Sequence, residues 1–128
     1  MKLRIKGNSV RLRLTQREVA ELAATGRVED RIEFGFEPEQ FLTYAVVAEK
    51  RAPEVFAKFE NGQISIIIPQ AAAEKWAASD DAGICAEQNL STDRTLRIAV
   101  EKDFACLTPR AGEDESDNFP HPKSEKNC

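Results

Sequence analysis

Apolar and polar side chains alternate along the first fourteen residues, MKLRIKGNSVRLRL, on both sides of a central Gly-Asn pair. A period of two is typical of a strand that buries one face, and a two-residue Gly/Asn loop is typical of a β-hairpin. The pattern therefore predicts paired strands over residues 2–6 and 9–14, with Arg4 opposite Arg11. Like charges that face each other destabilise a sheet, so we expect acidic groups of the fold or a bound anion to compensate them.

A helix is predicted directly after this hairpin. The segment Thr15-Gln-Arg-Glu18 fits a capping box, in which each of the two end side chains accepts a hydrogen bond from the backbone amide of the other. Apolar residues then recur at helical spacing to about Thr25, and Gly26 supplies the left-handed residue that ends many helices. A second, alanine-rich helix is predicted over residues 70–79.

The remaining apolar patterns have the periodicity of strands. A second hairpin is predicted at Asn61-Gly62, because a type I′ turn needs positive φ at both positions. The further strands are predicted over residues 27–36, 41–49, 55–60, 63–68, 84–88 and 94–103. We expect an α+β fold, with about seven or eight mainly antiparallel strands in a strongly curved or barrel-like sheet and two short helices. Both a barrel and an open sheet fit this pattern, and no internal repeat of residues is evident.

Length and composition indicate one globular domain. The chain has 128 residues, of which 41% are hydrophobic and 31% charged, and a chain of this size can bury a core without metal or disulfide. Past Pro109 the residues are mostly small, polar or charged and bury too little apolar surface to order themselves. We therefore predict a domain over residues 1–108 and an acidic, polar tail over residues 109–128, flexible or docked through Phe119.

Charge is distributed unevenly along the chain and limits the possible partners. Residues 1–14 hold five cationic side chains and no acidic one, whereas the whole chain has a net charge of −4. The acidic balance argues against general nucleic-acid binding, and no segment approaches the roughly 20 apolar residues of a membrane span. Three widely spaced cysteines without a CxxC pair or a secretory leader favour a cytoplasmic protein with reduced thiols.

The cationic face of the first hairpin is the leading candidate site. We expect it to bind an unknown protein partner or a small anion, because guanidinium groups match the geometry of phosphate and carboxylate. Its residues are Lys2, Arg4, Lys6, Arg11 and Arg13. Alternatively, acids on the polar faces of other strands neutralise it within the fold, and the candidates are Glu33, Glu101 and Asp103. The acidic run 113–117 could also dock there and mask the site until a competing anion displaces it.

No catalytic residue, metal site or cofactor is expected. Cys106, His121 and Cys128 lie at spacings that match no zinc pattern, and Cys85 lies further back in the chain. The sequence contains no glycine-rich phosphate loop, nucleophile elbow or metalloprotease motif. These observations predict a non-enzymatic binding protein and leave its oligomeric state open.

Two end motifs support a family assignment. The chain begins with KLRIKGNSVRLRLTQREV, and near its end EKDFACL precedes an acidic stretch and Phe119-Pro120. With these motifs it resembles a small family of bacterial proteins of unknown function. The resemblance implies a cytoplasmic bacterial protein and carries over no activity and no catalytic residue.

The charged strands are also similar to those of triphosphate-tunnel enzymes, which line a closed antiparallel barrel with basic and acidic residues. Those enzymes open with an E-x-E-x-K strand that supplies metal-binding carboxylates, whereas this chain opens with Lys2-Leu-Arg-Ile-Lys6. The resemblance implies an alternative function, a metal-dependent phosphate-ester enzyme with a charged barrel interior. Glu101 and Asp103 would then hold the metal from another strand.

Overall fold

The computed structural model describes residues 1–105 and 116–120, which contain eight strands and two α-helices. In chain order the elements are β1 (Lys2–Ile5), β2 (Ser9–Leu14), α1 (Gln16–Thr25), β3 (Arg27–Glu33), the 3₁₀ turn η1 (Pro38–Gln40), β4 (Phe41–Glu49), β5 (Phe56–Glu60), β6 (Gln63–Pro69), α2 (Gln70–Ala77), β7 (Gly83–Ser91) and β8 (Arg94–Lys102). The expectation of an α+β fold is confirmed.

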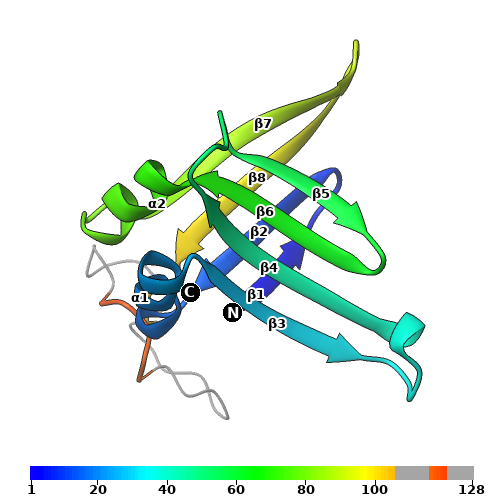
Figure 1. Ribbon diagram of the computed structural model, residues 1–128, viewed down its shortest axis with the longest axis horizontal. Coiled ribbons are helices and arrows are strands. Elements are labelled where there is room, and N and C mark those ends of the chain that lie inside the picture. Colours follow the sequence, from blue (N-terminus) through cyan, green and yellow to red (C-terminus); the bar gives the residue numbers. More distant parts are fainter. Residues whose placement is uncertain (106–115, 121–128) are drawn as a thin grey trace.

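The strands form two four-stranded sheets, and neither closes into a barrel (Figure 1). Sheet A has the order β1-β2-β8-β7, and sheet B has the order β3-β4-β6-β5. In each sheet two antiparallel hairpins are joined at the centre by a parallel pair, β2 with β8 or β4 with β6. The expected barrel-like sheet is therefore wrong, and each of the two sheets is mixed, with two antiparallel strand pairs and one parallel pair. Alternation shows which side of a strand faces the core, but it does not show which distant strand lies beside it.

The two halves of the chain repeat the same order of hairpin, helix and hairpin. Replacing β1 and β2 by β5 and β6, and β8 and β7 by β4 and β3, converts the order of sheet A into that of sheet B read from its other edge. The registers obey the same rule: Val10 pairs with Ile98, and Ile64, 54 positions after Val10, pairs with Tyr44, 54 positions before Ile98. The fold therefore contains an internal repeat with a topological pseudo-two-fold relation, although the residues of the two halves differ.

Local sequence signals account for the predicted helix start and the tight turn. Thr15 Oγ1 accepts a hydrogen bond from the Glu18 amide and the Glu18 carboxylate accepts one from the Thr15 amide, so the capping box is confirmed. Gly26 ends α1 with a φ of 82°, and Asn61 and Gly62 have φ values of 50° and 72°, as a type I′ turn requires. Neither α1, with ten residues, nor α2, with eight, is long and apolar enough to cross a membrane.

The β7 strand is longer than the sequence pattern indicates. A strand was expected over residues 84–88, yet Gly83–Ser91 pairs with β8, and the register shifts between Asn89 and Ser91. The outer part of this hairpin is exposed on both faces. Polar residues can occupy a strand there because no apolar alternation is needed to fill a core.

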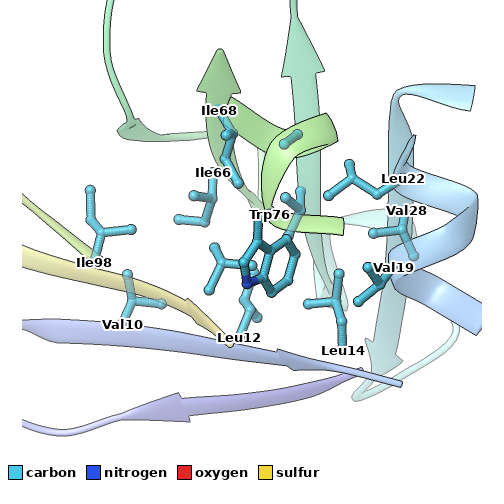
Figure 2. Packing of buried hydrophobic residues seen from close by; sticks show 13 residues of the cluster. Val10, Leu12, Leu14, Val19, Leu22, Val28, Ile66, Ile68, Trp76 and Ile98 are labelled. Atoms are coloured by element: carbon cyan, nitrogen blue, oxygen red, sulfur yellow. The ribbon is translucent and has the colours of Figure 1, made fainter. Parts of the chain in front are cut away.

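One hydrophobic core lies between the two sheets and under the helices (Figure 2). The buried residues of α1 are Val19 and Leu22, and those of α2 are Ala73 and Trp76, each 54 positions later. Figure 2 shows the Trp76 indole reaching down from α2 toward Leu12 of β2. The core thus follows the internal repeat, with one large and one small side chain in α2 where α1 has two of medium size.

Polar contacts join the edge strands of the two sheets. The Gln88 side chain of β7 accepts a hydrogen bond from the Ala57 amide of β5 (2.6 Å) and donates one to the Ala57 carbonyl (3.0 Å). At the opposite edge, the Met1 amino group lies 2.8 Å from the Glu18 carboxylate and 3.8 Å from the Asp30 carboxylate of β3. The contact of Gln88 satisfies the backbone amide and carbonyl of Ala57, which an edge strand would otherwise leave unpaired.

Residues 116–120 lie against the domain beside the start of α1. The first amide of α1 donates a hydrogen bond to the Asp117 carbonyl, and Phe119 forms a parallel bridge with Phe104. The two phenyl rings pack edge to face, and the Phe119 ring lies 5.4 Å from Nζ of Lys102, which is only 5% exposed. Phe119 therefore extends the core at the end of β8.

Candidate functional site

The outer face of sheet A carries the cationic side chains of the first hairpin. Val10 and Leu12 of β2 point into the core. The alternate residues of β2 therefore point outward, and so do the residues of β1, β8 and β7 that are paired in the same rows. Across the four strands one outward row reads Arg4, Arg11, Ala99 and Cys85, and the next includes Ser9, Arg97 and Glu87.

Two acids of β8 and its extension neutralise part of this face. The Glu101 carboxylate lies 3.3 Å from Arg11 Nε and 3.4 Å from Arg13 Nε, so one acid serves two guanidinium groups. The Asp103 carboxylate lies 3.1 Å from Lys2 Nζ. Glu101 and Asp103 are thus internal counter-charges, but two carboxylates face a larger number of cations.

Glu33, the third acid considered as a counter-charge, belongs to sheet B and not to the sheet of the hairpin. It is the last residue of β3 at the edge of sheet B, and its carboxylate lies 2.6 Å from Arg31 Nη2. Alternation correctly put Glu33 on a polar face, but that face belongs to the other sheet. The ion pair of Glu33 is thus formed within β3 and not with a cation of the hairpin.

A hollow of about 620 Å³ opens on the outer face of sheet A. Its lining combines the short side chains Ser9, Cys85 and Ala99 with the long ones Arg4, Lys6, Arg11, Glu87 and Arg97. The hollow exists because the short side chains leave space that the long ones surround. Its volume lies within the range of roughly 300–1,000 Å³ that is usual for small-molecule sites.

Positive charge dominates the lining of the hollow. Four cationic side chains contribute to it and one acid, Glu87. Within residues 1–105 and 116–120, Arg4, Lys6 and Arg97 form no ion pair, and Arg11 shares Glu101 with another arginine. The hollow therefore presents guanidinium and ammonium donors that no carboxylate of the described part of the chain occupies.

The equivalent face of sheet B has no such charge excess. The internal repeat maps the row Arg4, Arg11, Ala99, Cys85 onto the row Lys58, Ser65, Ala45, Glu29. Ser65 is 4% exposed and Ala45 is fully buried, and the cations of β3 pair with acids of the same strand. Because both sheets have the same topology, the cationic hollow results from the residues of sheet A and not from the fold itself.

The sequence pattern identified only part of this lining. Of the five predicted cations, Arg4, Lys6 and Arg11 line the hollow, whereas Lys2 and Arg13 do not. Sequence reasoning missed Arg97 and Glu87, which come from β8 and β7. The one available signal was the alternation of residues 94–103, which puts Arg97 on a polar face without revealing that β8 lies beside β2.

The other chemistry-bearing residues do not assemble into a site in the part of the chain that the structure describes. No group of three His, Cys, Asp or Glu side chains there could hold a metal ion. Cys106, His121 and Cys128 lie outside the described residues, as do the acids at positions 113–115 of the suggested masking run. Cys85 is an exposed free thiol in the lining of the hollow.

The arrangement that the phosphate-ester alternative requires is not formed. The strands enclose no barrel interior, and the cationic side chains of the hairpin lie on an outer face. Glu101 and Asp103, the carboxylates suggested as metal ligands, are each engaged by cations of this hairpin. The charges are therefore arranged as a cationic surface with internal counter-ions.

Comparison with known proteins identifies a family but no activity. A family model matches residues 1–123, and it is described as a family of unknown function. The expectation of an uncharacterised family is thus confirmed. No curated protein matches the chain, and no solved structure matches it.

Proposed function

The chain belongs to this family of unknown function, DUF7009, and we propose that it is a small non-enzymatic protein that binds an anionic ligand in the hollow of sheet A. The ligand carries at least one phosphate or carboxylate group, and it is held by Arg4, Arg11 and Arg97 with Lys6 nearby. The observation that carries the proposal is the group of hollow-lining cations that have no ion-pair partner among the described residues.

Relief of repulsion supports binding at this position. Arg4 and Arg11 are direct partners on antiparallel strands, and like charges in such a pair destabilise the sheet. An oxyanion between them would accept hydrogen bonds from two guanidinium groups, an interaction roughly twice as strong as a neutral hydrogen bond. Binding would therefore turn an unfavourable cross-strand pair into a favourable one.

The size of the hollow indicates more than a bare ion. A volume of about 620 Å³ is large enough for a small organic molecule, with the anionic group on the arginines and the remainder over the short side chains. The exposed free thiol of Cys85 supports our proposal of a cytoplasmic location.

Thermal unfolding in the presence of anions tests the proposal. Sulfate and inorganic triphosphate should raise the melting temperature of the wild-type protein in proportion to occupancy. Arg4→Ala should abolish this rise, whereas Lys58→Ala, its counterpart in the internal repeat, should leave the rise intact. Comparison at equal anion concentration removes the general stabilisation that sulfate gives to folded proteins. Equal rises in the wild type and Arg4→Ala would refute the site.

A second variant separates a pocket from a diffuse charged surface. Ala99 lies between Arg11 and Cys85 in the outward row, so the longer side chain of Ala99→Leu should project into the hollow between the cations while keeping all four of them. We expect this variant to lose the triphosphate-dependent rise in melting temperature. If it binds triphosphate as the wild type does, surface charge alone attracts the anion and the pocket is ruled out.

A further inference from the structure

The end of the sandwich opposite the helices leaves the core open. Both helices lie at one end of the sheets, and the four connections within the hairpins β1–β2, β3–β4, β5–β6 and β7–β8 lie at the other (Figure 1). We call the end with the hairpin turns the open end. We define it by five large hydrophobic side chains that are 44–72% exposed: Ile5, Ile32, Phe34, Phe59 and Leu90. Each of the four edge strands, or the connection that follows it, contributes at least one of them.

Ile5, Ile32 and Phe59 belong to the inward faces of their strands and are not scattered surface residues. Ile5 pairs with the buried Val10, and Phe59, 54 positions after Ile5, pairs with Ile64, which packs against the core. The helices cover the core at one end, whereas no described segment covers it at the other. Because monomeric proteins rarely expose a large apolar patch, an occupant of the open end is expected.

The two rims of the open end carry opposite charges. On sheet B the β3–β4 connection and the β5–β6 turn hold Glu37, Glu39 and Glu60, all exposed and without an ion pair among the described residues. On sheet A the corresponding turns hold Lys6 and Arg94, which also lack an ion pair there. The one acid in these sheet A turns, Asp93, accepts a hydrogen bond from Ser91. One rim is therefore acidic and the other basic.

We propose that a second copy of this chain covers the open end, in a dimer whose two-fold axis runs along the opening. Rotation about such an axis exchanges the rims, so the acidic rim of each copy faces the basic rim of the other. The β3–β4 connection then lies opposite the partner's β1–β2 turn, and the β5–β6 turn lies opposite the partner's β7–β8 turn. Opposite charges meet on both sides of an apolar centre, which is the self-complementarity that an isologous dimer requires.

The oligomeric state of the full chain, measured by analytical ultracentrifugation over a range of concentrations, tests the proposal. The wild type should be a concentration-dependent dimer. Phe59→Ser should weaken dimerisation at least about thirtyfold, the effect expected for a central interface residue, with little change in the melting of the monomer because Phe59 is 66% exposed. A wild type that stays monomeric at every concentration would overturn the proposal and leave the open end to another occupant.

Charge exchange tests the orientation of the two copies. Glu60→Lys and Arg94→Glu should each weaken dimerisation several-fold, and the double variant should restore it, because Glu60 faces the partner's Arg94. Glu49→Lys is the matched control, since Glu49 is an exposed acid at the helix end of β4. A dimer that resists both Phe59→Ser and Glu60→Lys would use a different surface and contradict the proposal. None of these four residues lines the hollow, so failure of the dimer and failure of the anion site are measured separately.

Discussion

Glu101 limits the positive charge of the hairpin face, so Glu101→Gln should lower stability and raise anion affinity at the same time. The Glu101 carboxylate lies 3.3 Å and 3.4 Å from the Nε atoms of Arg11 and Arg13. Glutamine preserves the length and polarity of this side chain and removes its charge. Arg11 would then join Arg4 as an unpaired cation of the hollow.

The expected stability loss follows from the exposure of the two ion pairs. The side chains of Glu101, Arg11 and Arg13 are 27%, 38% and 41% exposed, and such pairs contribute about 0.2–1 kcal/mol each. Together they amount to about 1 kcal/mol, which in a domain of this size lowers the melting temperature by roughly 3–5 °C. Removing one negative charge near the bound anion favours binding by about 1 kcal/mol, or about fivefold in affinity.

Thermal unfolding and triphosphate titration measure both effects. Without the anion, Glu101→Gln should melt at a lower temperature than the wild type. With triphosphate, its melting temperature should rise more than that of the wild type, because stabilisation increases with the ratio of ligand concentration to Kd and reaches about 2.7 kcal/mol at a hundredfold excess. Glu87→Gln is the matched control, because Glu87 lines the hollow and forms no ion pair within residues 1–105 and 116–120: affinity should rise with no stability loss. Weaker triphosphate binding by Glu101→Gln would refute this account of the charge balance.

Three further predictions concern the body of the fold. Thr15→Ala should lower the free energy of unfolding in urea by about 1 kcal/mol, because the capping box of α1 is lost; an unchanged value would contradict this role. Gln88→Ala should cost about 1–2 kcal/mol by leaving the Ala57 backbone unpaired, and hydrogen exchange at the Ala57 amide should accelerate. Burial, and then the Asp30 and Glu18 carboxylates, raise the pKa of Tyr44. The unfolded phenol ionises first, so stability should fall as pH rises above about 10. Absorbance titration of this single tyrosine should detect the raised pKa, and Asp30→Asn should lower it.

The register of each tight hairpin was predictable because its signals are local. Arg4 lies opposite Arg11, and Phe59 lies opposite Ile64, as two-residue turns require. The same locality explains the correct start of α1, since Thr15 and its capping partner are three residues apart. The β7 strand was partly missed because its outer residues pair outside the core, where the sequence carries no apolar period.

The candidate site was only half predictable for the opposite reason. Alternation put Arg97 and Glu33 on polar faces of their strands, but the two side chains lie in different sheets. Arg97 adds to the cations of the hollow, and Glu33 pairs within sheet B. Neither outcome has a local signal, because paired residues of β2 and β8, such as Ser9 and Arg97, are 88 positions apart in the sequence.

The sequence by itself determined the elements, the two hairpin registers and the excess of cations on one face of the first hairpin. The tertiary structure alone decided that β2 and β8 lie parallel at the centre of a sheet, that Glu101 offsets two arginines, and that short side chains leave a hollow between long ones. The physical reason is that side-chain periodicity depends on neighbours a few residues apart, whereas strand order depends on contacts between distant segments.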